Sequence, residues 1–155
     1  MKRIICIGNP IAGSDAAGPA VFERLSREPL PADVELVDGG LGGIDLLGLV
    51  EGSERVVFVD AVTGWAPPGT VVVLEGADLQ EATAGRYEHQ AGFAYLLRAL
   101  PHLLKPPVPV RVVGLESPAG PRAVERAAML AVNFTAVAGP ASAQSPLTDL
   151  RRAGR

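Results

Sequence analysis

The chain has 155 residues, 48% of them hydrophobic and 20% charged, and a formal net charge of −3. This length suits one globular domain with its own core, and the apolar content excludes a disordered chain. The net charge gives no indication of a nucleic-acid-binding surface, and no apolar stretch approaches the roughly 20 residues of a membrane span.

The cysteine content and the N-terminus bear on the cellular compartment. Cys6 is the only cysteine, so an internal disulfide is impossible. The apolar run at residues 4–7 is too short for the hydrophobic part of a signal peptide. We therefore expect a soluble cytoplasmic protein without a membrane partner or a nucleic-acid partner.

The first part of the chain alternates apolar runs with amphipathic segments. Pro19 is tolerated only near the start of a helix, which places a helix directly after the glycine-rich loop 8–18. A second glycine-rich loop, at residues 39–43, precedes a short helix and is expected to be mobile. Strands are predicted over residues 3–7, 34–38 and 55–61, and helices over residues 19–27 and 44–50.

The second part continues the alternation with one exception. The turn between residues 61 and 70 is too short for a crossover helix, so the strand after it is expected to be an antiparallel edge strand. Strands are predicted over residues 70–74 and 108–115, and helices over residues 93–104 and from Pro121 onward, with an inner face of Val124, Ala127, Ala128, Ala131 and Phe134.

This order of elements predicts an α/β fold. The strands are nearly continuous runs of Val, Ile and Leu, as expected where helices cover both faces of a sheet. We predict a three-layer α/β/α sandwich with a mostly parallel, twisted, five-stranded sheet. One domain is expected over residues 1–138, followed by a flexible C-terminal tail at residues 139–155.

Three acidic residues follow strands or lie in the loop after one. Asp38 and Asp60 end two apolar strands, and Asp15 lies in the loop after the first strand. Ligands of parallel sheets bind beyond the carboxyl ends of the strands, where these carboxylates would converge. Structural roles remain open, because Asp15 is equally compatible with a helix N-cap and Asp38 with a turn. For Asp60 we favour a functional role, since burying a carboxylate in a strand is costly unless it is paired or bound to a metal.

The remaining candidates are a histidine that could bind a metal and two residues that could act as a nucleophile. His89 precedes the amphipathic helix, and its imidazole could join two carboxylates in a metal site, although its position alone is a weak signal. Ser14 lacks the motif of a serine nucleophile, and Cys6 reads as a core residue. The catalytic residue therefore remains unknown.

Taken together, these motifs resemble the hydrogenase maturation endopeptidases, which trim the C-terminal extension of nickel–iron hydrogenase large subunits. The resemblance covers about residues 3 to 137. Its main motifs are, in chain order, Gly8-Asn9 with Asp15 and Gly18, Asp38-Gly39-Gly40, Val59-Asp60-Ala61 and His89-Gln90.

The resemblance implies an aspartic-type, metal-binding endopeptidase that acts on a large-subunit precursor after nickel insertion. It places the metal ligands at Asp15, Asp60 and His89, and a substrate-binding segment at Asp38, Gly39 and Gly40. Nickel would be recognised in the substrate rather than held permanently, and another divalent cation is a candidate ligand of the isolated protein.

One position departs from the family pattern. Family members usually carry two adjacent acidic residues in the first loop, and this chain has Ser14 at the first of them. This departure keeps an alternative open, in which the same fold serves as a non-catalytic metal- or ligand-binding module. A different hydrolase ranks last, since it would need a nucleophile that the sequence does not display.

Overall fold

The computed structural model describes residues 1–76, 78–80 and 91–137. Its strands are β1 (Lys2–Cys6), β2 (Val34–Asp38), β3 (Arg55–Val62), β4 (Val71–Glu75) and β5 (Val110–Glu116). Its helices are α1 (Ala17–Leu25), α2 (Leu47–Glu51), α4 (Ala91–Leu103) and α5 (Pro121–Ala136), with short 3₁₀ helices η1 (Gly13–Asp15) and η2 (Ile44–Leu46).

The five strands form one sheet in the order β2-β1-β3-β5-β4. β2, β1, β3 and β5 run parallel, and β4 pairs antiparallel with β5 at the edge. The short connection between β3 and β4 leaves no room for a crossover helix, and the predicted antiparallel edge strand is confirmed.

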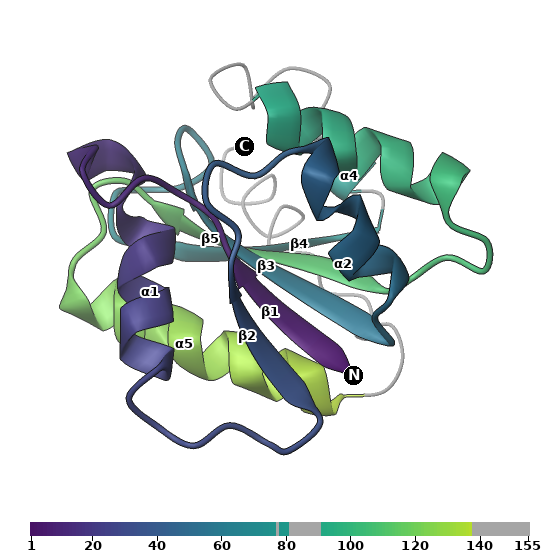
Figure 1. The fold of residues 1–155 in the computed structure, drawn as a ribbon. Helices are drawn as coiled ribbons and strands as arrows, with labels where there is room; N and C mark the ends of the chain where they lie inside the picture. Colours follow the sequence, from purple (N-terminus) through teal and green to yellow (C-terminus); the bar gives the residue numbers. More distant parts are fainter. Residues whose placement is uncertain (77, 81–90, 138–155) are drawn as a thin grey trace.

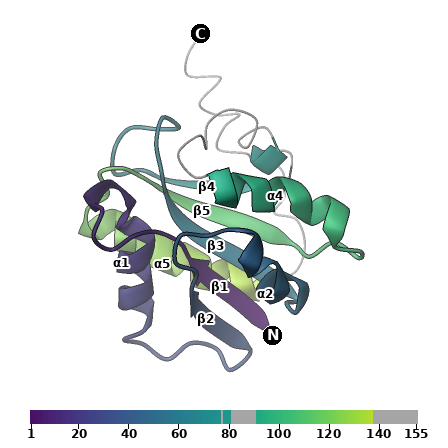
Figure 2. The same cartoon turned by 45° about the horizontal axis from the view of Figure 1, so that its top comes forward.

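Helices cover both faces of the sheet (Figures 1 and 2). α1 and α5 lie on one face, and α2 and α4 lie on the other. Each face has its own apolar core, with Val21 and Ala127 in the first and Phe58 and Phe93 in the second. The rings of Phe58 and Phe93 meet edge to face with centroids 5.0 Å apart. The predicted three-layer sandwich is confirmed.

Several element ends differ from the prediction. α1 begins at Ala17 rather than Pro19, because the first four N–H groups of a helix need no helical partner and a proline is tolerated among them. β3 extends to Val62 and β5 to Glu116, since these two residues still pair across the sheet. On α5 the predicted alanines are buried, whereas Val124 and Phe134 are only partly buried and Thr135 is buried.

The strand order creates one position where the chain reverses direction across the sheet. From β1, the chain passes to β2 on one side, and later enters β3 on the other side. In open α/β sheets such a topological switch point forms a crevice at the carboxyl ends of the two strands. Here the crevice lies beyond Cys6 and Val59, which are register partners in β1 and β3.

The predicted C-terminal tail falls outside the described residues. The division into a domain and a tail at residues 139–155 therefore stays a prediction. Within the described ranges, no helix is both long enough and apolar enough to cross a membrane.

Candidate active site

Asp60 lies in the central strand β3, two residues before its end, and is 0% exposed. Its neighbours along the strand alternate between the two cores. Phe58 and Val62 belong to the core under α4, and Val59 and Ala61 belong to the core under α1 and α5. Asp60 therefore faces the α4 side of the sheet. Burying a carboxylate is costly unless it is paired, hydrogen-bonded or bound to a cation.

The β1–β3 ladder ends at the residue before Asp60. The Ile7 N–H donates to the carbonyl oxygen of Val59 at 2.8 Å, and the next N–H, that of Gly8, donates instead to the carbonyl oxygen of Gly40 at 2.8 Å. The chain thus changes its hydrogen-bonding partner from β3 to the loop after β2. This change places Asp60 at the crevice of the switch point.

Asp15 reaches the same edge from η1 in the loop after β1. The Asn9 N–H donates both to Asp15 Oδ2, at 3.1 Å, and to its carbonyl oxygen, at 3.0 Å. The loop folds back tightly here, because a Cβ on Gly8, whose φ is +143°, would lie 2.2 Å from the Asp15 carbonyl oxygen. The N-cap of α1 is Ala16, so the interpretation of Asp15 as the N-cap is wrong.

A contact from β5 fixes the position of η1. Ser117, which directly follows β5, donates from its Oγ to the carbonyl oxygen of Ser14 at 2.8 Å. The backbone of Ser14 therefore joins the loop that carries Asp15 to the end of β5. The Ser14 residue is exposed.

The loop after β2 lies against the end of β1. The Gly39 N–H donates to the carbonyl oxygen of Cys6 at 2.8 Å, and Asp38 Oδ1 accepts from the Gly40 N–H at 3.0 Å. A Cβ on Gly42 would lie 2.9 Å from Ile7 Cγ2. The glycines thus allow close packing and a turn, and these contacts hold a loop that its composition alone predicts to be mobile.

His89 lies outside the described residues, so its predicted place in the site stays a prediction. α4 begins two residues later, at Ala91. A Cβ on Gly92 would lie 3.1 Å from the carbonyl oxygen of Gly42, so the start of α4 lies against the loop after β2. Within the described ranges, no three His, Cys, Asp or Glu side chains gather as a metal site would require.

Glu116 is a second buried carboxylate near this edge, and the sequence analysis missed it. It is 3% exposed. Its two carboxylate oxygens accept backbone N–H groups of Gly64, Trp65 and Ala66 at 2.5, 3.1 and 3.2 Å. The available signal was the same as for Asp60, an acid after a run of apolar strand residues. Its hydrogen bonds indicate that it anchors the loop after β3.

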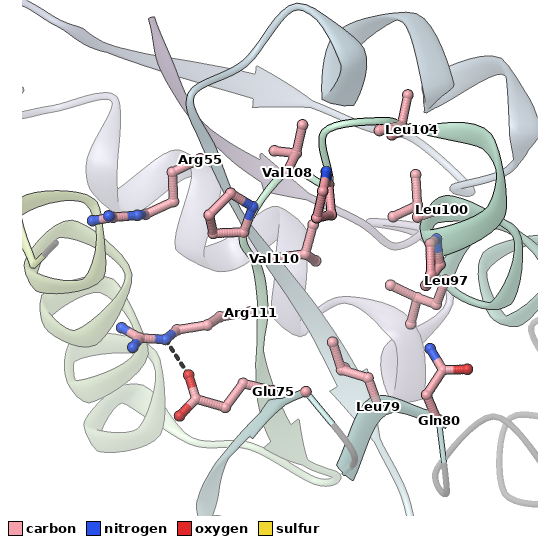
Figure 3. Close-up of a pocket in the computed structure, with 14 residues that line it drawn as sticks. Arg55, Glu75, Leu79, Gln80, Leu97, Leu100, Leu104, Val108, Val110 and Arg111 are labelled. Carbon is pink, nitrogen blue, oxygen red and sulfur yellow. Dashed lines mark hydrogen bonds and ion pairs between the residues drawn. The ribbon is translucent and has the colours of Figure 1, made fainter. Parts of the chain in front are cut away.

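A separate cavity of about 540 Å³ lies at the opposite edge of the sheet (Figure 3). Leu97 and Leu100 of α4 and Val110 at the start of β5 form part of its apolar wall, and Arg111 and Glu75 form an ion pair beside it. Asp15 and Asp60 do not line this cavity. It is therefore distinct from the candidate site.

Cys6 is excluded as a nucleophile by its environment. Burial, and to a lesser extent the negative charge of Asp38, raises the pKa of the Cys6 thiol to about 12. At neutral pH the thiol therefore keeps its proton, and only the thiolate is reactive. The side chain belongs to the core beneath α1 and α5.

This environment predicts a specific alkaline instability. The unfolded thiol ionises near pH ~8.5, whereas the folded thiol stays protonated up to its raised pKa. Above pH ~8.5, unfolding thus releases a proton, and the free energy of unfolding should fall by about 1.4 kcal/mol per pH unit from this group. We expect urea unfolding between pH 8 and 10 to reveal this slope, and Cys6→Ala to reduce it. Equal slopes in the two proteins would contradict the prediction.

A family model described as "Hydrogenase maturation protease" matches residues 19–129. The chain belongs to this family. Hydrogenase 2 maturation protease of Escherichia coli K12 is 30% identical over 115 residues, which cover 72% of this chain and 70% of that protein. The hydrogenase expression/formation protein HupD of Rhodobacter capsulatus is 33% identical over 93 residues, covering 58% of this chain but only 44% of its own length.

The fold agrees with this assignment. The solved structure of the hydrogenase maturating endopeptidase HybD from Escherichia coli superposes with a TM-score of 0.69 at 25% identity, covering 99% of this chain and 93% of that chain. The predicted family and enzyme class are therefore confirmed, and this chain is a protease of the hydrogenase maturation family. The family match includes Asp60 and begins after Asp15.

Proposed function

We propose that this protease removes the C-terminal extension of a nickel–iron hydrogenase large-subunit precursor after nickel has been inserted. Membership of the family supports the substrate class. The observation that carries the proposal is the fully buried Asp60 near the end of β3, directly beyond the last β1–β3 hydrogen bond. Ligands of parallel sheets bind beyond the carboxyl ends of the strands, which favours contact of Asp60 with a metal or a scissile peptide.

Nickel carried by the precursor is the proposed ligand of Asp15, Asp60 and His89. Two carboxylates and an imidazole form a donor set that suits nickel and other borderline divalent cations, which makes such a cation a candidate ligand of the isolated protein. The two described acids fit this role, because they come from different segments and approach the same edge of the sheet. Bound nickel would polarise the scissile carbonyl or lower the pKa of the attacking water.

Two residues near the site bear on the type of protease mechanism. The N–H of Asn9 donates to Asp15 Oδ2 and orients that carboxylate. The neutral thiol of Cys6 offers no nucleophile. This combination supports an aspartic-type, metal-dependent reaction over a cysteine-protease mechanism.

Asp38, Gly39 and Gly40 are the proposed binding segment for the extended substrate tail. Asp38 and Gly40 are exposed, and no heavy atom lies within 4 Å of the position that a Cβ on Gly40 would occupy. The backbone at Gly40 is therefore open to a peptide that approaches from the crevice.

The cytoplasm is the proposed compartment for this reaction. The chain's single cysteine is buried as a free thiol, which suits a reducing compartment.

The decisive experiment compares nickel-loaded with nickel-free precursor in the presence of the purified protease. We expect mass spectrometry to detect loss of a C-terminal peptide only from the nickel-loaded form. A folded protease that leaves every candidate nickel-loaded precursor intact would refute the substrate assignment. Equal trimming of both forms would refute the recognition of nickel while leaving the peptidase activity in place.

A further inference from the structure

The most exposed large apolar side chains lie beside the candidate site. Among the described residues, Ile11 is 92% exposed and Leu41 is 74% exposed, more than any other large hydrophobic side chain. Ile44, close to Leu41 in sequence, is 46% exposed. Single exposed apolar residues are common on protein surfaces, so their position decides whether they matter.

These side chains occupy the two loops that flank the crevice. Ile11 belongs to the loop between β1 and η1, and Leu41 to the loop between β2 and η2. The two loops are joined by the hydrogen bond from the Gly8 N–H to the Gly40 carbonyl oxygen, at 2.8 Å. From this junction they run toward opposite sides of the carboxyl edge of the sheet (Figures 1 and 2). Ile11 and Leu41 therefore belong to two loops that meet beside the crevice.

Both loops hold their apolar residue in a defined position. The Ile11 N–H donates to Asn9 Oδ1 at 3.0 Å. Leu41 lies between Gly40, with a φ of +55°, and Gly42, which packs against Ile7. Because the backbone of both loops is already held in place, little conformational entropy is lost when a partner binds, which favours binding.

The chemistry of the entrance selects the kind of partner. Residues 8–18 and 39–46 contain two acidic residues, Asp15 and Asp45, and no lysine or arginine. An anionic partner such as a nucleic acid or a lipid surface finds no counter-charge there. Aliphatic side chains at an entrance without basic residues match an apolar protein surface.

We propose that Ile11, Leu41 and Ile44 form a docking rim for the precursor. The occupant of this rim is an apolar surface of the folded precursor next to its C-terminal extension. This inference rests on the proposed function, because the rim borders the site at which the extension would be cut. Docking on the two loops beside the crevice would hold the extension over Asp60 and contribute to affinity rather than to the chemical step.

The test measures binding and cleavage separately, with purified nickel-loaded precursor. In the double variant Ile11→Ser/Leu41→Ser, we expect the Kd for the precursor and the KM of cleavage to rise at least about tenfold, since each change removes aliphatic contact area. The kcat at saturating precursor and the melting temperature should stay close to those of the unmodified protein. The conservative double variant Ile11→Val/Leu41→Met should retain most of the affinity.

Met129→Ser is the matched control. Met129 is 58% exposed and lies on α5, outside the two loops that carry the rim. We expect this variant to bind and cleave normally. A Kd of the rim variant within threefold of the unmodified protein, or an equal loss in Met129→Ser, would overturn the docking rim. So would a change from dimer to monomer on sedimentation of the rim variant, which would make the rim a self-association surface.

The two levels of the proposal fail in different ways. If the protease binds the precursor through the rim but does not cut it, the proposed function fails and the rim stands. If it cuts the precursor and the rim variant binds normally, the rim alone fails. If the protease neither binds nor cuts any precursor, both fall.

Discussion

Asp60→Asn should abolish cleavage of the nickel-loaded precursor while leaving the protein folded. The substitution conserves the volume of a side chain that is 0% exposed and keeps one of its two oxygens, but it removes the negative charge. Loss of an anionic metal ligand should lower the cleavage rate by about 100-fold or more, beyond the effect usual for a residue that only supports a ligand. The free energy of unfolding should fall by no more than about 1 kcal/mol, because burial of a charge is itself unfavourable.

Glu116→Gln is the matched control, since Glu116 is also a buried carboxylate close to the same edge. Its two oxygens accept three backbone N–H groups, and an amide would direct its own N–H₂ at some of these donors. We expect the free energy of unfolding to fall by about 1–3 kcal/mol and the cleavage rate per folded molecule to stay near that of the unmodified protein.

The two variants are compared by chemical denaturation and by initial cleavage rates. The expected pattern is opposite in the two proteins, with activity lost in Asp60→Asn and stability lost in Glu116→Gln. Retained cleavage in a folded Asp60→Asn variant would remove Asp60 from the proposed mechanism. A large stability loss in that variant, in proportion to its loss of activity, would assign Asp60 a structural role.

Gly18→Ala should destabilise the fold more than any other alanine substitution considered for this chain. Gly18 lies in the first turn of α1, where its Cβ would be 1.8 Å from the carbonyl oxygen of Ile7. Real Cβ atoms do not approach so closely, and backbone rather than a flexible side chain stands in the way. α1 would have to move away from β1, and we expect a loss of about 3 kcal/mol in the free energy of unfolding.

Gly48→Ala provides a control with the opposite sign. Gly48 lies in α2, and no heavy atom would lie within 4 Å of its added Cβ. Alanine has the higher helix propensity, so the free energy of unfolding should rise by about 0.5–1 kcal/mol. Thermal unfolding should separate the two variants by roughly 10 °C. Equal melting temperatures would show that α1 can shift without penalty and would contradict the close approach at Gly18.

The local pattern of the sequence was sufficient for the elements and the fold class. The uninterrupted Val, Ile and Leu runs identified the strands, because strands buried on both faces need apolar side chains in both directions. The short connection after β3 identified β4 as an antiparallel edge strand, since a parallel crossover needs more residues. Both features are set by residues that are close together in the sequence, so they can be predicted from one sequence.

The loop glycines illustrate the limit of local reasoning. The glycine content alone predicts that the backbone of the loop after β2 is flexible. In the structure, Gly39 and Gly42 lie against Ile5 of β1 and Ile7 just after it, where a side chain would not fit. The close approach depends on the pairing of β1 with β2, and no local pattern contains that information.

The order of residues along the chain reveals that acids end several strands, whereas the surroundings of each acid depend on how the strands are arranged in the sheet. Asp38, Asp60 and Glu116 all follow apolar strand residues. Asp38 ends the edge strand β2 and is exposed, whereas Asp60 and Glu116 end or nearly end inner strands and are buried. The loop after β3 satisfies Glu116 with backbone N–H groups, while Asp60 lies where the β1–β3 ladder stops. Strand order sets these environments, because exposure and hydrogen-bond partners at a strand end come from elements distant in sequence.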